Sequence, residues 1–574
     1  MKDQPTPKTV TANASYQTAV NSAIVAAVFA LLVSGLLVRN YLQITVFDPV
    51  RAEKLEILKL KVADEPKNEE LLANIRETDL QIRQDRLRRL DFSRKGTWLL
   101  LGCVVVFLIS AKYAANCRKK LPSPLPAGDS SKKQVHEAKL TRWSVTASLV
   151  LLGCVALFLA VRSRVDFSST GPMVDSYPSK EDIHKNWPYF RGAGGLGISA
   201  FTNISSSWNG KTLEGIVWKT PVPLEGKNSP IVWGNRVFVS GADEKKRQVY
   251  CFDASSGELL WSGDVPNRAP PGTGPLESED DTGLAAPTMV TDGERIYAIF
   301  ATGDIGCFDF EGKQIWAKNP GVPDSTYGYA SSLAMYRNLV IIQYDQGAAE
   351  DNKSRLIALD GFTGRSMWET KRPVPNSWTS PIVAETEKGY QIITCADPWV
   401  IAYDPNNGAE LWRVDCLGTD VAPSPIYAGG LVFAIEPYTE LIAIRPDGTG
   451  DVTKSHIAWV AEDGIPDICS PVSNGKLIWL LTTDGTLTCY ATEDGKKLYE
   501  QDLEQSFQAS PSLVGDRLYM LSEKGVMFIA QAGTEYKELA RCELGEICYA
   551  SSAFTDGRIY IRGDKNLYCI GKSN

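Results

Sequence analysis

The sequence predicts an all-β, eight-bladed β-propeller in the C-terminal part of the chain, preceded by an α-helical transmembrane region. Two observations predict the propeller: a tryptophan-bearing turn motif that recurs along the C-terminal two-thirds of the 574 residues, and a serine-containing motif every 40 to 57 residues. Three long apolar runs near the N-terminus predict the membrane region. We therefore divide the chain into a membrane region (1–165), a linker (166–186) and a propeller domain (187–574).

The membrane region is predicted to cross the bilayer three times, at about 18–38, 97–115 and 143–161. Each run is long enough to cross a hydrocarbon core of roughly 30 Å as a helix. No small-residue cleavage site follows the first run, so we expect it to be retained. Residues 48–95 carry charges of both signs with leucines at helical spacing, which predicts a helical hairpin. That hairpin is either a solvated amphipathic element or a coil for oligomerisation or for docking of a partner.

The tryptophan motif consists of a short apolar run, an Asp, a Gly turn and a strand that ends in an aromatic residue. It is clearest at 358–368 (ALDGFTGRSMW) and recurs with small changes at 251–261, 307–316, 402–412 and 489–499. A Trp ring that buries about 150–250 Å² can hold neighbouring blades together. The residues that we predict to dock each blade against the next are Trp218, Trp261, Trp316, Trp368, Trp412, Trp459 and Tyr499.

Two blades depart from this motif. In blade five, residues 443–451 are inserted before the aromatic position. In blade seven, residues 529–539 (IAQAGTEYKEL) lack both the Asp and the Trp.

The serine motif is a Ser or Ala followed by Pro, a few apolar residues and a turn, and it marks the start of each blade. The eight copies begin at Ser229, Ala286, Ser331, Ser380, Ser424, Ser470, Ser510 and Ser551, and those at 331 and 551 lack the Pro. About four short strands follow each copy, which is the pattern of a propeller blade.

The last repeat, at 549–570, offers three strands and lacks the fourth. A strand around Trp218 (215–221) precedes the first blade and has no blade of its own. An open ring would leave unpaired strand edges. We therefore expect the Trp218 strand to pair with the C-terminal strands and to close the ring.

Composition excludes several classes of function. A net charge of -8 gives no electrostatic case for nucleic-acid binding. The 12 cysteines form no CxxC or adjacent pair, which removes the usual zinc, c-type haem and thioredoxin signatures. We expect most of them to be small buried hydrophobic residues, although Cys542 and Cys548 could pair in an oxidising compartment.

Other motifs carry little chemistry. Residues 192–197 satisfy GxGxxG, but no strand precedes them and no helix follows, so we expect a chance match. The acidic run 277–281 is expected to be a solvated loop, with a weak divalent-cation site as the alternative. The three histidines form no credible set with a nucleophile and an acid; they are His136, His184 and His456.

The repeat at 358–368 resembles the tryptophan-docking repeat of the pyrroloquinoline-quinone (PQQ)-like β-propellers, and 187–192 (WPYFRG) resembles the W-P-x-F-R-G lead-in of bacterial members. The resemblance covers 187–572. It implies a fold more than an activity, because the family includes quinoprotein dehydrogenases, an outer-membrane assembly lipoprotein and membrane-anchored proteins of unassigned role. The predicted three-span N-terminus looks like the last group.

The main hypothesis is therefore a membrane-anchored, non-catalytic scaffold that binds other envelope or membrane proteins through loops such as 267–283 and 348–353. We expect it in the bacterial inner membrane with the propeller on the periplasmic side, as is usual for such domains, although a bare count of Lys and Arg around the spans favours the cytoplasm. Two alternatives stay open: a PQQ-dependent quinoprotein dehydrogenase with Ca²⁺ that passes electrons to the membrane, and a ligand sensor. The sequence has no adjacent Cys pair and no calcium-binding set that matches the dehydrogenases. We therefore assign no catalytic, cofactor-binding or metal-binding residue.

Overall fold

The computed structural model describes residues 9–42, 92, 95–96, 98–114, 177–269, 282–418 and 420–572. The chain divides into two compact units, 1–172 and 173–574. In the first unit, helix α1 (Thr9–Leu42) contains Tyr16–Leu37, whose 22 residues have a mean hydropathy of 2.3 and are long enough to cross a bilayer. This segment coincides with the first predicted span.

The other membrane predictions are covered only in part by the described residues. The second predicted span is helical over Trp98–Ala114, which is a shorter apolar helix. The third predicted span and nearly all of the predicted hairpin lie outside the described residues. The end of the predicted linker is ordered, since α5 (Lys180–Lys185) is a short helix capped by Ser179.

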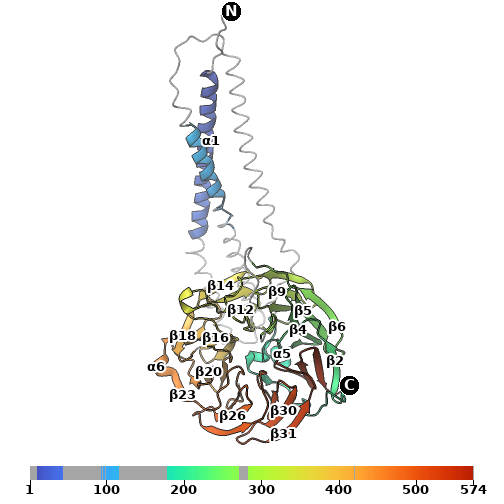
Figure 1. Cartoon of the computed structure of the whole chain (residues 1–574). Helices are drawn as coiled ribbons and strands as arrows, with labels where there is room; N and C mark the ends of the chain where they lie inside the picture. The colour runs from blue at the N-terminus through green and yellow to red at the C-terminus, as the bar shows by residue number, and fades with distance from the viewer. Residues whose placement is uncertain are drawn as a thin grey trace, which may run out of the picture. The chain divides into compact units, whose positions relative to one another are not determined.

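The second unit is a ring of eight β-sheets, which confirms the predicted eight-bladed propeller (Figure 1). Within each blade neighbouring strands of the four-stranded core are antiparallel, and in the first seven blades they follow chain order from the ring centre outward. The first four blades consist of β3 (Ile231–Trp233), β4 (Arg236–Ala242), β5 (Arg247–Asp253) and β6 (Leu259–Asp264); β7 (Val290–Thr291), β8 (Arg295–Ile299), β9 (Ile305–Asp309) and β10 (Gln314–Lys318); β11 (Ala334–Tyr336), β12 (Leu339–Tyr344), β13 (Arg355–Asp360) and β14 (Ser366–Lys371); and β15 (Ile382–Thr386), β16 (Gly389–Ala396), β17 (Trp399–Tyr403) and β18 (Glu410–Asp415).

The last four blades follow the same order. They consist of β19 (Ile426–Ala428), β20 (Leu431–Glu436), β21 (Glu440–Ile444) and β23 (Ile457–Ala461); β24 (Val472–Ser473), β25 (Leu477–Leu481), β26 (Thr486–Ala491) and β27 (Lys497–Asp502); β28 (Ser512–Val514), β29 (Arg517–Leu521), β30 (Val526–Gln531) and β31 (Glu538–Glu543); and β32 (Ala553–Thr555), β33 (Arg558–Arg562), β34 (Asn566–Gly571) and β2 (Ile216–Pro221).

The eighth blade is closed by the strand that carries Trp218, as predicted. β2 pairs antiparallel with β34, and Trp218 lies opposite Cys569. In Figure 1 the red C-terminal strands therefore meet the green start of the propeller. This pairing removes the open edge that an incomplete last blade would leave.

The two irregular blades are associated with extra edge contacts at the rim of the ring. The residues inserted into blade five form β22 (Gly450–Asp451), which adds a parallel fifth strand to β18 of blade four, and the short helix α6 (Thr453–His456). In blade seven, Asn209 forms a parallel bridge to Glu543 on β31, and the neighbouring Trp208 is buried. A Trp from upstream thus covers the blade that lacks its own.

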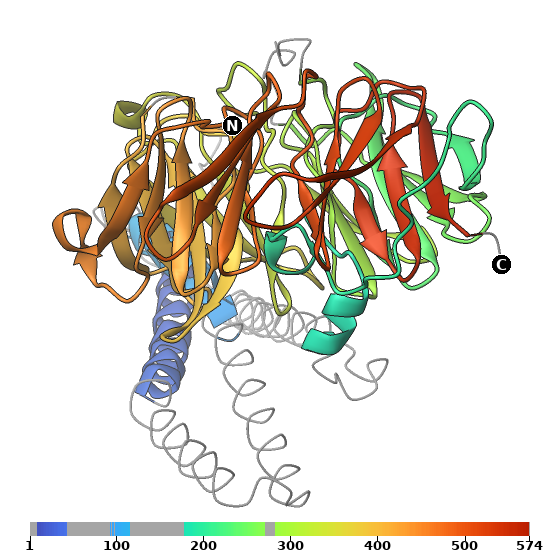
Figure 2. The same cartoon turned by 90° about the horizontal axis from the view of Figure 1, so that it is seen from below.

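The ring has two distinct faces. The turn face is formed by the turns between the first and second and between the third and fourth strands of each blade. The loop face is formed by the turns between the second and third strands and by the connections from one blade to the next. α5 lies at the turn face, at the lower edge of the ring in Figure 2, where Lys180 pairs with Glu385 of β15 at 2.5 Å.

The centre of the ring is filled by the segment 187–199, which we call the plug. Trp187 bridges to Val232 of blade one and packs edge-to-face on Phe554 of blade eight, with ring centroids 5.4 Å apart. The plug ends in β1 (Ile198–Ser199), which pairs parallel to β28 of blade seven. The plug therefore ties several blades together at the axis.

Candidate functional site

The loop face opens into a central funnel whose base is a ring of side-chain hydroxyls. At the start of each blade a backbone N–H donates to the hydroxyl at the same place in the next blade. The seven bonds run from Ser229 to Thr288 (3.0 Å), Thr288 to Ser332 (3.1 Å), Ser332 to Ser380 (2.9 Å), Ser380 to Ser424 (2.9 Å), Ser424 to Ser470 (3.0 Å), Ser470 to Ser510 (3.0 Å) and Ser510 to Ser551 (2.9 Å). The recurring serine of the sequence motif is therefore a link between blades.

The structure locates the hydroxyl of that motif away from the first motif residue in two blades. In blade two the hydroxyl comes from Thr288, two residues after the predicted Ala286, because Pro287 follows Ala286 and imitates the Ser-Pro signal of the other blades. In blade three the contact is made by Ser332 and not by Ser331. The strand that follows starts two residues after the hydroxyl in every blade.

The wall of the funnel is built by the residue two positions before each hydroxyl. From blade one to blade eight these residues are Lys227, Ala286, Ala330, Trp378, Ala422, Ile468, Gln508 and Tyr549. Tyr327, Asp420, Tyr438 and Asp467 lie higher on the wall, and the cavity has a volume of about 580 Å³. This volume lies within the range of roughly 300–1,000 Å³ that is usual for binding pockets.

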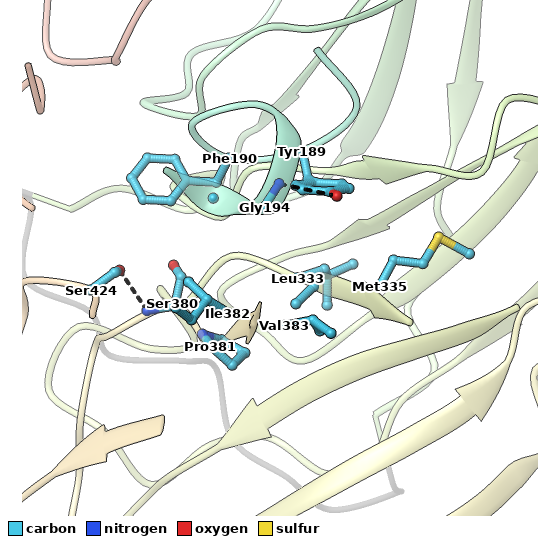
Figure 3. Close-up of a pocket in the computed structure, with 12 residues that line it drawn as sticks. Tyr189, Phe190, Gly194, Leu333, Met335, Ser380, Pro381, Ile382, Val383 and Ser424 are labelled. Atoms are coloured by element: carbon cyan, nitrogen blue, oxygen red, sulfur yellow. Dashed lines mark hydrogen bonds between the residues drawn. The ribbon is translucent and has the colours of Figure 1, made fainter. Parts of the chain in front are cut away.

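The plug forms the floor of the funnel. Phe190 lines the funnel, and it also lines a second cavity of only about 20 Å³ between the plug and blades three and four (Figure 3). In that view Gly194 donates its N–H to the Tyr189 hydroxyl at 3.3 Å, above the Ser380–Ser424 contact. A cavity of this size holds about one water molecule, so the funnel is the larger of the two spaces at the axis.

The plug is held by Arg191, which is almost completely buried. Its Nη2 donates to the carbonyl oxygen of Pro471 at 2.5 Å, while Nε and Nη1 have no partner among the described residues. Burial lowers the pKa of Arg191 to about 9 because the charged form loses its hydration. The residues 192–197 that satisfy GxGxxG form the turn after Arg191, including the 3-10 helix η3 (Ala193–Gly195), and they open no helix that could hold a phosphate.

Trp378 is positioned by a buried polar network below the loop face. Asp345 and Arg372 form an ion pair with no exposed surface, with Asp345 Oδ1 2.7 Å from Arg372 Nε. Ser377 Oγ donates to Asp345 at 2.7 Å, and Gln343 donates to both Ser377 and Thr379. Burial alone would lower the pKa of Arg372, but the Asp345 carboxylate outweighs it and the net pKa is raised.

The predicted docking residues lie away from the funnel, on the outer strands. Five of them donate the indole N–H to a carbonyl oxygen of the next blade: Trp218 to Ala254 (3.0 Å), Trp261 to Phe310 (2.8 Å), Trp316 to Gly361 (2.8 Å), Trp368 to Pro405 (3.1 Å) and Trp459 to Thr492 (3.0 Å). Each of these rings also covers a glycine of that turn, namely Gly257, Gly312, Gly364, Gly408 and Gly495.

The other two predicted docking residues make different contacts. Trp412 packs among residues of blade five but donates its indole N–H to Gln391 of its own blade at 2.9 Å. The Tyr499 hydroxyl accepts a hydrogen bond from Trp479 of its own blade at 2.9 Å, and its ring lies 6.4 Å from that of Tyr536. Blade seven lacks the Asp of the docking turn, and in blade five a longer loop follows Asp447 and Gly448 in place of the tight turn. Neither blade therefore offers the usual docking turn to its neighbour.

The remaining candidate residues are scattered. Within the described residues, His184 lies on α5 and His456 lies 3.5 Å from Asp447 at the edge of blade four, while His136 is outside them. The ten described cysteines are free thiols; Cys542 and Cys548 contact the carbonyl oxygens of Ser206 and Glu546 and do not pair with each other. The acidic run 277–281 lies outside the described residues.

The funnel residues do not fit PQQ and calcium. PQQ is a tricarboxylate, whereas Lys227 is the one basic residue among the described residues of the wall and Asp420 and Asp467 would repel an anion. In the part of the chain that the structure describes, no three His, Cys, Asp or Glu residues lie together in a way that could hold a metal ion. We therefore derive no reaction step through these groups.

Sequence reasoning missed the funnel residues because they do not repeat. The signal that could have found them is their position: two residues before each serine, where the sequence changes from Lys to Ala, Trp, Ile, Gln or Tyr. Asp420 and Tyr438 have no such signal, since each comes from a loop of its own.

Comparison with known proteins places this ring in a family. A family model described as outer membrane protein assembly factor BamB matches residues 211–326, 245–467 and 396–534. A tetrathionate hydrolase from Acidithiobacillus ferrooxidans is 23% identical over 231 residues, which are 40% of this chain and 45% of that protein. An outer membrane protein assembly factor BamB from Alkalilimnicola ehrlichii is 26% identical over 223 residues, which are 39% of this chain and 52% of that protein. The chain thus spans about half the length of these curated relatives.

Among solved structures, the quinohemoprotein alcohol dehydrogenase from Comamonas testosteroni has a TM-score of 0.50 at 13% identity, over 70% of this chain and 84% of that chain. This likeness shows the fold alone. The family match spans 211–534, from the end of the plug region to blade seven, and it agrees with the eight-bladed ring and its docking turns. The chain therefore belongs to the BamB family of PQQ-like repeat β-propellers.

Proposed function

We propose that this chain is a membrane-anchored, non-catalytic scaffold of the bacterial envelope that binds other proteins through its loop face. Its anchor is the N-terminal membrane region, which begins with the apolar segment Tyr16–Leu37, and its propeller lies on the periplasmic side of the inner membrane. The names of the BamB relatives, which describe outer membrane protein assembly, support a role in the envelope.

The observation that carries this proposal is a set of exposed apolar residues on the loop face. Tyr438, Ile468 and Ile547 all lie on the loop face and are 78%, 41% and 50% exposed. Large exposed apolar or aromatic residues around a concave surface are typical of protein-binding sites. The other exposed large apolar residues of the described propeller lie on the outer strands or on the segment before β2: Leu213, Leu259, Leu260, Ile315, Met367, Val460 and Leu539.

The two loops that the sequence indicated as binding elements also belong to the loop face. The connection 267–283 runs from β6 to β7, although 270–281 lies outside the described residues. The loop 348–353 joins β12 to β13 and contains η4 (Ala349–Asp351), and Lys353 pairs there with Asp324 at 2.7 Å. By their place between the strands, the described residues of both loops belong to the loop face, and we include them in the proposed binding surface.

The test compares two faces of the same folded protein. A photo-cross-linking residue placed at Ile547 in the full-length chain should capture a defined partner from intact cells. The double substitution Tyr438→Ala and Ile547→Ser, made in the chain without the cross-linking residue, should reduce recovery of that partner by affinity purification about tenfold or more, since buried anchor residues are worth about 2 kcal/mol or more. Met367→Ser is the matched control, because Met367 lies on an outer strand and is 57% exposed. This variant should leave recovery unchanged.

Two results would contradict the proposal. One is equal partner recovery by the loop-face variant and the control. The other is dye-linked oxidation of alcohols or sugars by the purified chain after addition of PQQ and Ca²⁺. A phosphatase reporter fused after Asn574, which is active only outside the cytoplasm, tests the proposed side of the membrane.

A further inference from the structure

The funnel wall differs in charge from one side to the other. Asp420 and Asp467 lie on the connections that lead into blades five and six, and Tyr438 lies between them on the turn after β20. Lys227 and Tyr549 lie across the ring on the connections into blades one and eight. One side of the funnel is therefore acidic and aromatic, and the other carries the single lysine.

The Lys227 ammonium group contacts an aromatic ring, whereas the carboxylates of Asp420 and Asp467 have no basic partner in the described structure. Lys227 Nζ lies 4.3 Å from the centroid of the Tyr549 ring, a cation–π contact. The two oxygens of Asp467 accept hydrogen bonds from the hydroxyls of Thr483 (2.6 Å) and Tyr438 (2.9 Å). Asp420 is exposed and has no hydrogen bond or ion pair to any residue that the structure describes. A cation that enters this side would meet two carboxylates and no competing basic group.

Aromatic rings complete the same side of the funnel. Trp378 and Tyr327 pack edge-to-face with ring centroids 5.2 Å apart. The backbone N–H of Trp378 donates to Val421, the residue after Asp420, which keeps the indole beside the acidic loop. The indole N–H of Trp378 is buried and has no acceptor among the described residues. A ligand that supplies a carbonyl oxygen here would satisfy a donor that is otherwise costly to bury.

We propose that the funnel binds a lysine or arginine side chain presented by an extended segment of a partner protein. The cationic head would pair with Asp420 and Asp467, its apolar stem would pack on Trp378 and Tyr438, and a backbone carbonyl would accept from the Trp378 indole. A cavity of about 580 Å³ holds several residues and not one side chain alone, which favours a peptide over a free amine. This inference rests on the proposed function, because the segment belongs to a partner bound at the loop face.

The experiment measures fluorescence anisotropy of a labelled peptide of alternating Arg and Ser with the full-length chain in detergent. The same peptide with Glu in place of Arg should not bind. Asp420→Asn should weaken binding about threefold, and the double variant with Asp467→Asn about tenfold, because partly exposed charge pairs are individually weak. Asn also suits the left-handed backbone of Asp420 (φ 60°), so the single variant should fold normally.

Glu535→Gln provides the control for overall charge. It removes the same charge from an exposed turn of the turn face, between β30 and β31, and should leave peptide binding unchanged. Equal weakening by this variant would show non-specific attraction to an acidic protein and would overturn the inference. So would displacement of the peptide by butylamine at concentrations close to that of the peptide, which would identify a site for free amines.

The inference and the proposed function can fail separately. If the Arg peptide does not bind but the Ile547 cross-link still captures a partner in a manner that requires Tyr438, the scaffold stands and the basic segment is wrong. If the peptide binds through Asp420 but no partner depends on Tyr438 and Ile547, the funnel is a site for basic side chains and the scaffold proposal is wrong.

Discussion

The docking turns and the funnel wall occur once in almost every blade, yet their residues vary to very different degrees. At the docking turn a Trp ring covers a Gly of the next blade in five of the eight contacts, with nearly the same hydrogen bond each time. At the funnel wall the equivalent positions hold Lys, Ala, Trp, Ile, Gln or Tyr. This difference indicates that the repeated residues hold the ring together. The residues that do not repeat give the funnel wall its individual shape and charge.

The funnel wall is supported at Trp378 by a buried ion pair, and breaking this pair gives the largest expected effect. Asp345→Asn leaves Arg372 buried beside a neutral amide, so we expect the free energy of unfolding to fall by about 3–5 kcal/mol. Urea unfolding of the full chain, followed by Trp fluorescence, measures this loss. Glu410→Gln breaks the more exposed pair with Arg413 and should cost less than about 1 kcal/mol. Equal losses in the two variants would mean that the buried pair adds nothing to the loop below Trp378.

The docking turn gives the next largest effect. Gly364 has a φ of 65°, and a Cβ added there would lie 2.7 Å from the Trp316 ring. Gly364→Ala therefore combines backbone strain of about 1–2 kcal/mol with overpacking of about 1–3 kcal/mol, and we expect a total loss of about 2–4 kcal/mol. Gly234→Ala is the control, because its φ is 57° and no atom lies within 4 Å of the added Cβ. If both variants lose the same stability, the Trp–Gly contact does not hold the blades.

Sequence reasoning predicts the fold well because its evidence is repeated. Eight copies of the serine motif and the unpaired Trp218 strand are enough to fix the number of blades and their closure. It misplaces the hydroxyl of blade two because Ala286-Pro287 has the local pattern, whereas the true register is set by the neighbouring blades through Thr288. The local pattern and the blade-to-blade contact disagree there by two residues, and in blade three by one.

The same reasoning could not find the plug contacts or the funnel, because both depend on residues brought together from distant repeats. Arg191 of the plug meets Pro471 of blade six, and Trp378 meets Tyr327 of the preceding connection, which lies 51 residues earlier in the chain. The cover of blade seven by Trp208 is also invisible in the repeat, since that residue precedes the first blade. Each of these contacts occurs once, so no repeating sequence pattern predicts it.

Tyr438 gives the smallest expected change in stability and separates the two regions most sharply. Its φ of 63° is unfavourable for a bulky residue, and its ring is 78% exposed. Tyr438→Gly relieves the strain but adds chain entropy to the unfolded state, so the free energy of unfolding should stay the same or rise by up to about 1 kcal/mol. Partner recovery through the Ile547 cross-link should nevertheless fall. Arg337→Gly, with a φ of 53° on the turn face, should relieve similar strain and leave partner recovery intact. If Tyr438→Gly lowers the free energy of unfolding by more than about 2 kcal/mol, this tyrosine stabilises the fold. Unchanged stability with lost partner binding would indicate that the strained backbone of Tyr438 serves recognition.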